Sequence, residues 1–127
     1  MSLCLVANWK LNGSKEFNHH WVLEFCRNFN GKNFSSIGIA PASLYLDHLQ
    51  TMLADNAIKI GAQNIDLEDT GARTGEISAS MIKDLGCTFC IIGHSERRTL
   101  FHETNKMIYQ KITQANNNSV IPILCIG

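Results

Sequence analysis

At 127 residues the chain has the length of one domain, and 45% hydrophobic with 17% charged residues is ordinary for a globular protein with a buried core. Lys plus Arg and Asp plus Glu number 11 each, so no net charge draws nucleic acid or an anionic membrane from a distance. The longest apolar runs are far too short to span a membrane, and no basic, apolar leader follows Met1. We therefore expect a cytoplasmic protein without nucleic-acid or membrane partners.

The five cysteines, without a secretory leader, favour reduced thiols. Cys87 and Cys90 form a CxxC pair, but their spacing at the entrance of an expected strand predicts that they point to opposite faces. No second pair supplies further zinc ligands. The sequence therefore predicts neither a metal site nor a redox site.

The first strand is expected at residues 3–7, which form a short apolar run. Turn residues follow at positions 12–14, and Ser14 is a candidate N-cap for a helix. Aromatic residues then recur at every fourth position, the spacing of one face of a helix. These residues are Phe17, Trp21, Phe25 and Phe29. The predicted end of this helix is Asn30-Gly31.

The second strand is expected at residues 37–40, before Pro41. Ser43 is the candidate cap of the helix that follows, whose apolar residues have helical spacing. These residues are Leu46, Leu49 and Leu53. Residues 58–63 then predict a third strand.

A long polar connection follows at residues 64–77 and contains two glycines. It is longer than most connections between elements, which makes it a candidate functional loop. Ser78 is the predicted start of a short helix, which Gly86 ends. Residues 88–92 are expected to form a fourth strand that is buried on both faces, the pattern of a parallel sheet.

A helix at residues 104–115 and a fifth strand at residues 120–126 complete the pattern. Successive strand ends are about 30 residues apart, which suits strand-helix units that feed a parallel sheet in sequence order. Eight such units would need about 240 residues, close to the roughly 250 typical of a (β/α)8 barrel. We therefore predict an α/β fold in which residues 1–127 form one domain, about half of such a barrel, with four βα units and a fifth strand.

Polar residues follow two of the expected strands. His94 and Glu96 fall just past the carboxyl end of the fourth strand, where α/β barrels and open α/β sheets place their ligands. Asn8 and Lys10 follow the first strand, and their spacing by two points both to the same side, while the tryptophan between them faces the helices. Lys10 would thus bring an ammonium group to the mouth of the barrel. The alternative is that Lys10 and His94 are ordinary surface residues.

Five short motifs extend along the whole chain. They are Ala7-Asn8-Trp9-Lys10, Gly61-Ala62-Gln63-Asn64, Thr74-Gly75-Glu76, residues 92–98, and Leu124-Cys125-Ile126-Gly127. Each is weak alone, but in their order and spacing the chain resembles the N-terminal half of triosephosphate isomerase. The resemblance implies the TIM (β/α)8 barrel fold, of which residues 1–127 would be the N-terminal half.

The resemblance also implies an activity. The family interconverts dihydroxyacetone phosphate and glyceraldehyde 3-phosphate through an enediolate, in glycolysis and gluconeogenesis. That reaction needs a base for a carbon-bound proton, an electrophile for the carbonyl oxygen, and cationic or dipolar groups for the phosphate. A cytoplasmic homodimer that takes a triose phosphate, with no cofactor and no metal, is implied as well.

By the same resemblance His94, Lys10 and Glu96 are catalytic, and Asn8 and Lys10 bind substrate. His94 would donate a hydrogen bond to the carbonyl oxygen, as a neutral imidazole beside the N-terminus of a short helix at residues 95–101. Lys10 would stabilise the phosphate and the developing oxyanion.

Glu96 has more than one reading. It would hold Lys10 when no substrate is bound, or relay a proton. A purely structural pair with Arg97 or Arg98 is the alternative. Ser95 and Thr74 are supporting residues by the resemblance.

Two positions depart from the family. Ala42 stands where a second proline is usual, and Arg73 stands where an apolar or aromatic residue is common, in the loop that in the family inserts into the partner subunit. The general-base glutamate, the lid loop and the glycine-rich phosphate-binding loops of the family all lie beyond Gly127. We therefore expect the 127-residue chain to be inactive alone and to self-associate.

Two other functions remain open. The first is a non-catalytic half barrel that works in assembly or binds a phosphate ligand. The second is a flavodoxin-like ligand-binding sheet, although the chain lacks the glycine- or hydroxyl-rich phosphate loop that such a sheet carries after its first strand.

Overall fold

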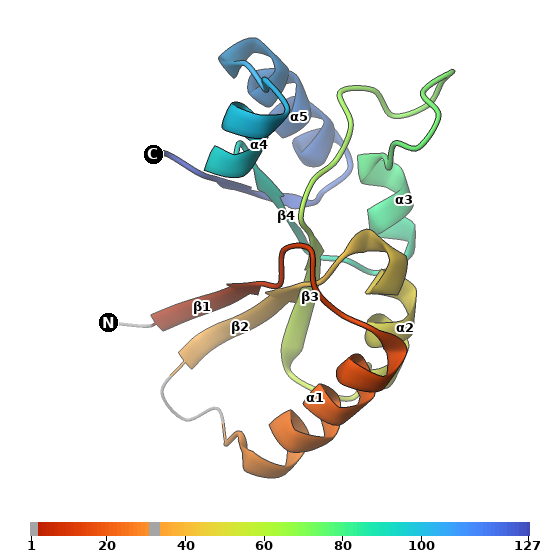
Figure 1. Cartoon of the computed structure of the whole chain (residues 1–127), viewed down its shortest axis with the longest axis vertical. Helices are drawn as coiled ribbons and strands as arrows, with labels where there is room; N and C mark the ends of the chain where they lie inside the picture. The colour runs from red at the N-terminus through yellow and green to blue at the C-terminus, as the bar shows by residue number, and fades with distance from the viewer. Residues whose placement is uncertain (1–2, 31–33) are drawn as a thin grey trace.

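The computed structural model describes residues 3–30 and 34–127. The described strands form a single curled sheet in which all neighbours are parallel and follow sequence order. The strands are β1 (Leu3–Asn8), β2 (Phe34–Ala40), β3 (Ile58–Ala62), β4 (Phe89–Ile92) and β5 (Ile121–Leu124). The helices lie on the outer side of the curl (Figure 1). The predicted half barrel with parallel strands is therefore confirmed.

The helices connect successive strands, as the spacing predicted. They are α1 (Lys15–Asn28), the 3-10 turn η1 (Ser43–Tyr45), α2 (Leu46–Met52), α3 (Ala79–Asp84), α4 (Ser95–Leu100) and α5 (Asn105–Asn117). Both α4 and α5 lie between β4 and β5 in the chain. No helix of the described residues is both long and apolar enough to cross a membrane.

Side-chain caps start most of these helices. Ser14 accepts a hydrogen bond from the amide of Phe17, and Ser78 accepts one from the amide of Met81, as predicted. The cap predicted at Ser43 is wrong. The chain there already has helical hydrogen bonds, since the Ser43 carbonyl accepts from the amide of Leu46, so Ser43 lies inside the 3-10 turn rather than before it.

The main core lies between the sheet and the helices. Leu46, Leu49 and Leu53 are buried in it, as their spacing predicted. The aromatic stripe of α1 is only partly buried. Trp21 and Phe25 pack against the core and stack on each other, whereas Phe17 remains 49% exposed. The fully buried residues of α1 are Asn18 and Val22, which lie beside the stripe.

Strand β4 is buried on both faces, as predicted. On the inner face, a Cβ atom at Gly61 would stand 2.4 Å from the Phe89 ring, so the glycine lets that ring fold over β3. Cys87 and Cys90 were predicted to point to opposite faces, which is wrong because both belong to the core between the sheet and the helices. Burial raises the pKa of Cys87 to about 11 and that of Cys90 to about 12, so both thiols stay protonated and unreactive at neutral pH.

The long connection at residues 64–77 has no helix or strand, as predicted. It extends beyond α3 in Figure 1. Arg73 closes the loop on itself, because its guanidinium donates two hydrogen bonds to the carboxylate of Asp66. This hydrogen bond from Arg73 holds the pKa of Asp66 below its ordinary value, against the opposing effect of burial. Arg73, which departs from the family pattern, thus has a structural partner within its own loop.

Candidate active site

The carboxyl ends of β1 and β4 bring three predicted residues together. The Lys10 Nζ atom lies 2.8 Å from Glu96 Oε1, and Glu96 Oε2 lies 3.5 Å from His94 Nδ1. The side chain of His94 is 23% exposed, while those of Lys10 and Glu96 are about half exposed, at 52% and 45%. The three groups therefore form one cluster that solvent and a small ligand can reach.

The turn after β4 places His94 at the start of α4. Gly93 has a φ of 73°, a left-handed conformation that suits glycine, and a Cβ there would approach Ile108 Cδ1 at 3.1 Å. His94 is the N-cap of α4, and its Nδ1 accepts a hydrogen bond from the amide of Glu96 at 3.2 Å. The short helix expected after His94 is thus confirmed, and one of its first amides, that of Glu96, donates to the ring, while those of Arg97 and Arg98 donate to the His94 carbonyl.

This cap determines which imidazole nitrogen carries the proton. A backbone amide always donates, so Nδ1 of His94 must be unprotonated to accept from Glu96. The carboxylate of Glu96 is farther from the same nitrogen, at 3.5 Å. In the neutral ring the proton is then on Nε2, which has no hydrogen-bond partner among the described residues and can donate to a ligand.

Asn8 is the last residue of β1, and Lys10 lies in the turn that follows. The Asn8 Oδ1 atom accepts a hydrogen bond from the Lys10 amide at 2.9 Å, so this oxygen shapes the turn. Trp9 lies between them and packs edge-on against Trp21, with ring centroids 5.1 Å apart. The prediction that the tryptophan faces the helices is confirmed.

Glu96 is paired with Lys10 and with neither neighbouring arginine. The hydrogen bond from Lys10 lowers the pKa of Glu96, an effect that desolvation partly offsets and the charge of Lys10 strengthens. Arg97 instead pairs with Glu103, at 2.8 Å. The alternative of a structural pair with Arg97 or Arg98 is therefore wrong.

Arg98 has a different partner set. Its Nε donates to the carbonyl of Gly93 at 2.9 Å, and its Nη1 donates to Asn105 Oδ1 at 2.7 Å. It thus ties the exit of β4 to the first residue of α5. These two hydrogen bonds stabilise the turn that carries His94.

A buried charge network beneath α4 was not foreseen from the sequence. Glu103 Oε2 lies 2.8 Å from both Arg97 Nε and Lys111 Nζ, and Lys111 Nζ also donates to Asn64 Oδ1 at 2.7 Å. The side chains of Glu103 and Lys111 are only 1% and 4% exposed. Burial raises the pKa of Glu103, but the hydrogen bonds from Lys111 and Arg97 outweigh it, so the pKa stays below its ordinary value.

The sequence did carry one signal for this network. Lys111 stands on the apolar stripe of its helix with Ile108 and Ala115, and a lysine on a buried face requires a buried partner.

The two predicted supporting residues, Ser95 and Thr74, differ in their position relative to the cluster. Ser95 is the exposed first residue of α4, next to His94 and Glu96. Thr74 is exposed in the loop at residues 64–77, and no hydrogen bond or ion pair among the described residues joins it to the cluster. The role of Thr74 stays a prediction.

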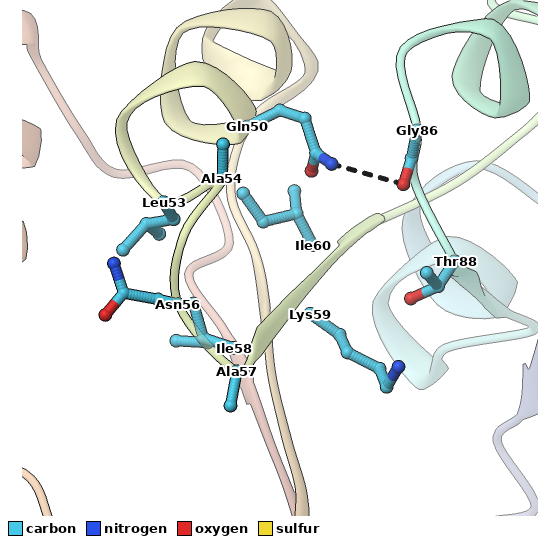
Figure 2. A pocket seen from close by; sticks show the side chains of 10 residues that line it. All are labelled: Gln50, Leu53, Ala54, Asn56, Ala57, Ile58, Lys59, Ile60, Gly86 and Thr88. Carbon is cyan, nitrogen blue, oxygen red and sulfur yellow. Dashed lines mark hydrogen bonds between the residues drawn. The ribbon is translucent and has the colours of Figure 1, made fainter.

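A hollow of about 240 Å³ lies at the opposite end of the sheet. Ala57, Lys59 and Thr88, at the amino ends of β3 and β4, line it, and Gln50 reaches the carbonyl of Gly86 at 3.3 Å (Figure 2). Parallel α/β folds bind their ligands at the carboxyl ends of the strands. The cluster of Lys10, His94 and Glu96 is therefore the candidate active site.

Comparison with known proteins identifies the family of the chain. The family model for triosephosphate isomerase matches residues 3–127. The triosephosphate isomerase of Baumannia cicadellinicola subsp. Homalodisca coagulata is 43% identical over 124 residues, which cover 97% of this chain and 48% of that protein. The one from Dictyoglomus thermophilum is 46% identical over 123 residues, which cover 97% of this chain and 49% of that protein.

The fold agrees as well. The crystal structure of triosephosphate isomerase from Bartonella henselae superposes with a TM-score of 0.88 at 29% identity, over 100% of this chain and 52% of that one. The chain thus spans about half the length of the relatives it matches. It belongs to the triosephosphate isomerase family, of whose barrel it is the N-terminal half.

Proposed function

We propose that this chain is the half of a triosephosphate isomerase that supplies the electrophile and the cation. The complete protein would interconvert dihydroxyacetone phosphate and glyceraldehyde 3-phosphate through an enediolate. The observation that supports this most directly is the cluster of Lys10, His94 and Glu96 at the carboxyl ends of the strands.

Each residue has a role that fits its contacts. Nε2–H of His94 would donate to the carbonyl oxygen as negative charge develops there, because Nδ1 is already occupied by the amide of Glu96. The ammonium of Lys10 would stabilise the phosphate and the enediolate, while Asn8 shapes the turn that presents it. Glu96 would hold Lys10 until substrate arrives. The reaction needs neither a metal nor a cofactor.

We propose that the 127-residue chain does not catalyse the reaction by itself. The base must accept a carbon-bound proton, and Glu96, the carboxylate of the cluster, is engaged by Lys10. General-base catalysis contributes about 10²- to 10⁴-fold to a rate. Polarisation of the carbonyl without removal of the proton would therefore leave turnover negligible.

The full protein would act as a homodimer in the cytoplasm, in glycolysis and gluconeogenesis. The loop at residues 64–77, of which residues 70–76 are exposed, would contact the partner subunit, with Arg73 held by Asp66 rather than available to the partner. The unpaired thiols of the described residues suit a reducing compartment.

The experiment joins residues 1–127 to the remaining half of the Dictyoglomus thermophilum relative and compares the joined protein with the 127-residue chain alone. Isomerase turnover is expected only in the joined protein. Lys10→Ala and His94→Gln should each lower kcat/KM by about 10²- to 10⁴-fold, whereas the control Lys59→Ala, at the opposite end of the sheet, should not.

Two outcomes would contradict the proposal. Turnover by the 127-residue chain alone that vanishes in Lys10→Ala and His94→Gln would refute the division of labour between the halves. A folded joined protein that binds a triose phosphate without converting it would favour the alternative, a half barrel that binds phosphate ligands.

A further inference from the structure

The loop at residues 64–77 projects beyond α3, and its tip, residues 70–76, is exposed throughout (Figure 1). Packing on the rest of the chain therefore contributes little to the order of the tip, and loops of this kind are ordinarily mobile. We propose that Asp66 and Arg73 form a clamp that keeps the tip in one conformation, in which it docks on a second copy of the complete protein. The inference rests on the proposed function for the dimer, but not for the order of the loop itself.

Asp66 connects this clamp to the base of the loop. Its amide donates to the carbonyl of Ile77 at 2.8 Å, which joins the two ends of the loop. Its carboxylate accepts a hydrogen bond from the amide of Glu68 at 3.0 Å, and its side chain is only 7% exposed. The carboxylate of Asp66 therefore has a fixed position, from which it can hold a group of the tip.

Arg73 reaches this carboxylate from the middle of the tip. Its Nε and Nη2 atoms donate to the two oxygens of Asp66, with 2.9 Å between Nη2 and Oδ1. Two hydrogen bonds between planar groups fix the orientation of the side chain as well as its distance. The backbone around Arg73 is bonded too, because its amide donates to the Gly71 carbonyl at 3.0 Å and its carbonyl accepts from the Glu76 amide at 3.1 Å. The ion pair thus holds the tip through its central residue.

A second anchor holds the part of the loop that precedes the tip. Asp69 Oδ1 accepts a hydrogen bond from the Ser80 amide in α3 at 3.0 Å and one from Asn118 Nδ2 at the end of α5 at 3.3 Å. Asp69 thus ties the outgoing part of the loop to two helices. The tip lies beyond this anchor, so its order depends on the clamp between Arg73 and Asp66.

The clamp also explains how an arginine is accommodated in a surface that docks on another subunit. Burying an unpaired guanidinium in such a contact would cost free energy, because the charge loses its water. Asp66 supplies the counter-ion from the same loop, so the tip needs no acidic partner on the second copy. A loop that is ordered before it docks also loses less conformational entropy, which strengthens the association.

The test uses Arg73→Gln, which removes the cation of the clamp at a side chain that is 41% exposed. Asp66→Asn opens the clamp from the other side and is the second variant if the first does not fold. Glu68→Gln is the matched control, because it removes an exposed charge from the same loop while the Glu68 amide keeps its hydrogen bond to Asp66.

The first measurement is independent of the dimer. Hydrogen exchange by NMR in the 127-residue chain reports on the Glu76 amide, which is bonded within the tip. Loss of a hydrogen-bonded charge pair should lower the protection of this amide about tenfold in Arg73→Gln and in Asp66→Asn. Glu68→Gln should leave the protection unchanged. Unchanged protection of Glu76 in folded Arg73→Gln would overturn the inference.

The second measurement is the Kd of the dimer of the joined protein described above, by analytical ultracentrifugation. A twofold dimer contains two such loops, so Arg73→Gln should raise Kd by about 10- to 10²-fold as the docking conformation becomes less populated. In an Asp66→Asn background the same substitution should raise it no further, because both residues act through one clamp.

Two results of this measurement would overturn the inference. A further rise of Kd in the Asp66→Asn background would show that Arg73 contacts the second copy directly. An unchanged Kd in Arg73→Gln would show that the order of the tip does not matter for docking. A joined protein that remains a monomer would refute the proposed dimer and leave the hydrogen-exchange test of the clamp intact.

Discussion

Single residues beneath α4 show how this half of the barrel accommodates buried charge. Lys111 is 4% exposed and has two partners, Glu103 Oε2 at 2.8 Å and Asn64 Oδ1 at 2.7 Å. Removing one member of a buried ion pair leaves the other charge without compensation, and this is more destabilising than replacing the whole pair. Substitutions in this network therefore measure how much its buried charges contribute to the stability of the chain.

We predict that Lys111→Met lowers the free energy of unfolding by about 1–3 kcal/mol, because the buried Glu103 carboxylate loses one of its two cations and keeps only Arg97. Lys106→Met, on the exposed side of the same helix, should change it by less than about 0.5 kcal/mol. Urea denaturation followed by circular dichroism measures both. Equal effects of the two substitutions would contradict the prediction.

The same carboxylate should make stability depend on pH. The folded-state pKa of Glu103 is below the ordinary value of 4.5, so between these values the unfolded chain binds more protons than the folded chain. The stability that Glu103 contributes is then complete above pH 4.5 and is lost as the pH falls through the folded-state pKa.

We predict that Glu103→Gln flattens the acid limb of a plot of the free energy of unfolding against pH. The control is Glu16→Gln, at an exposed glutamate of α1. It should reduce the slope of the free energy of unfolding at acid pH by less than Glu103→Gln does. Urea titrations between neutral pH and pH about 3 measure the slope. A slope that is the same in Glu103→Gln and in the unchanged chain would show that the carboxylate contributes nothing.

At the scale of elements, α4 controls the chemistry of His94. The helix is short, yet its N-terminus fixes the ring through the hydrogen bond from the Glu96 amide to Nδ1 at 3.2 Å. Nitrogen NMR should therefore find the neutral ring of His94 with its proton on Nε2. His19, exposed on α1, serves as the comparison and should show exchange between tautomers. A proton on Nδ1 of His94 would mean that the cap does not determine the tautomer.

Some elements could be predicted because their signals are local. The caps Ser14 and Ser78 and the stop at Gly86 depend on residues a few positions apart. The cap at Ser43 failed, since the chain begins a 3-10 turn one residue earlier than a side-chain cap allows. Nothing local distinguishes that start from an ordinary N-cap.

The features of the candidate site also divide into those that could be predicted from the sequence and those that could not. The meeting of Lys10 and His94 followed from a general rule, that parallel strands end at one edge of the sheet. The left-handed backbone of Lys10 did not, because lysine has no preference for it and Gln63, whose side chain donates to the Lys10 carbonyl, lies beyond β3, far away in the sequence. The Glu103–Lys111 pair was missed for another reason. Its members are eight residues apart, but Glu103 precedes α5 and therefore lies outside the helical spacing that marks Lys111 as buried.

At the scale of the whole molecule, the sheet has two open edges. β1 and β5 are its outermost strands, and each pairs with one neighbour among the described strands. Large apolar side chains near these edges are exposed, with Leu5 at 48% and Ile121 at 63%. Unpaired strand edges and exposed apolar surface both favour association with another chain.

We predict that the 127-residue chain self-associates in solution through these edges, so that light scattering reports a mass above that of one chain. The driving force is removal of apolar side chains from water together with pairing of free backbone N–H and C=O groups. Leu5→Lys combined with Ile121→Lys should therefore lower the apparent mass, because charge at a strand edge opposes pairing. Tyr109→Lys, at a side chain of α5 that is 72% exposed, is the control and should not. A compact monomer would contradict the prediction. Association that persists in the double variant would instead assign the contact to another surface.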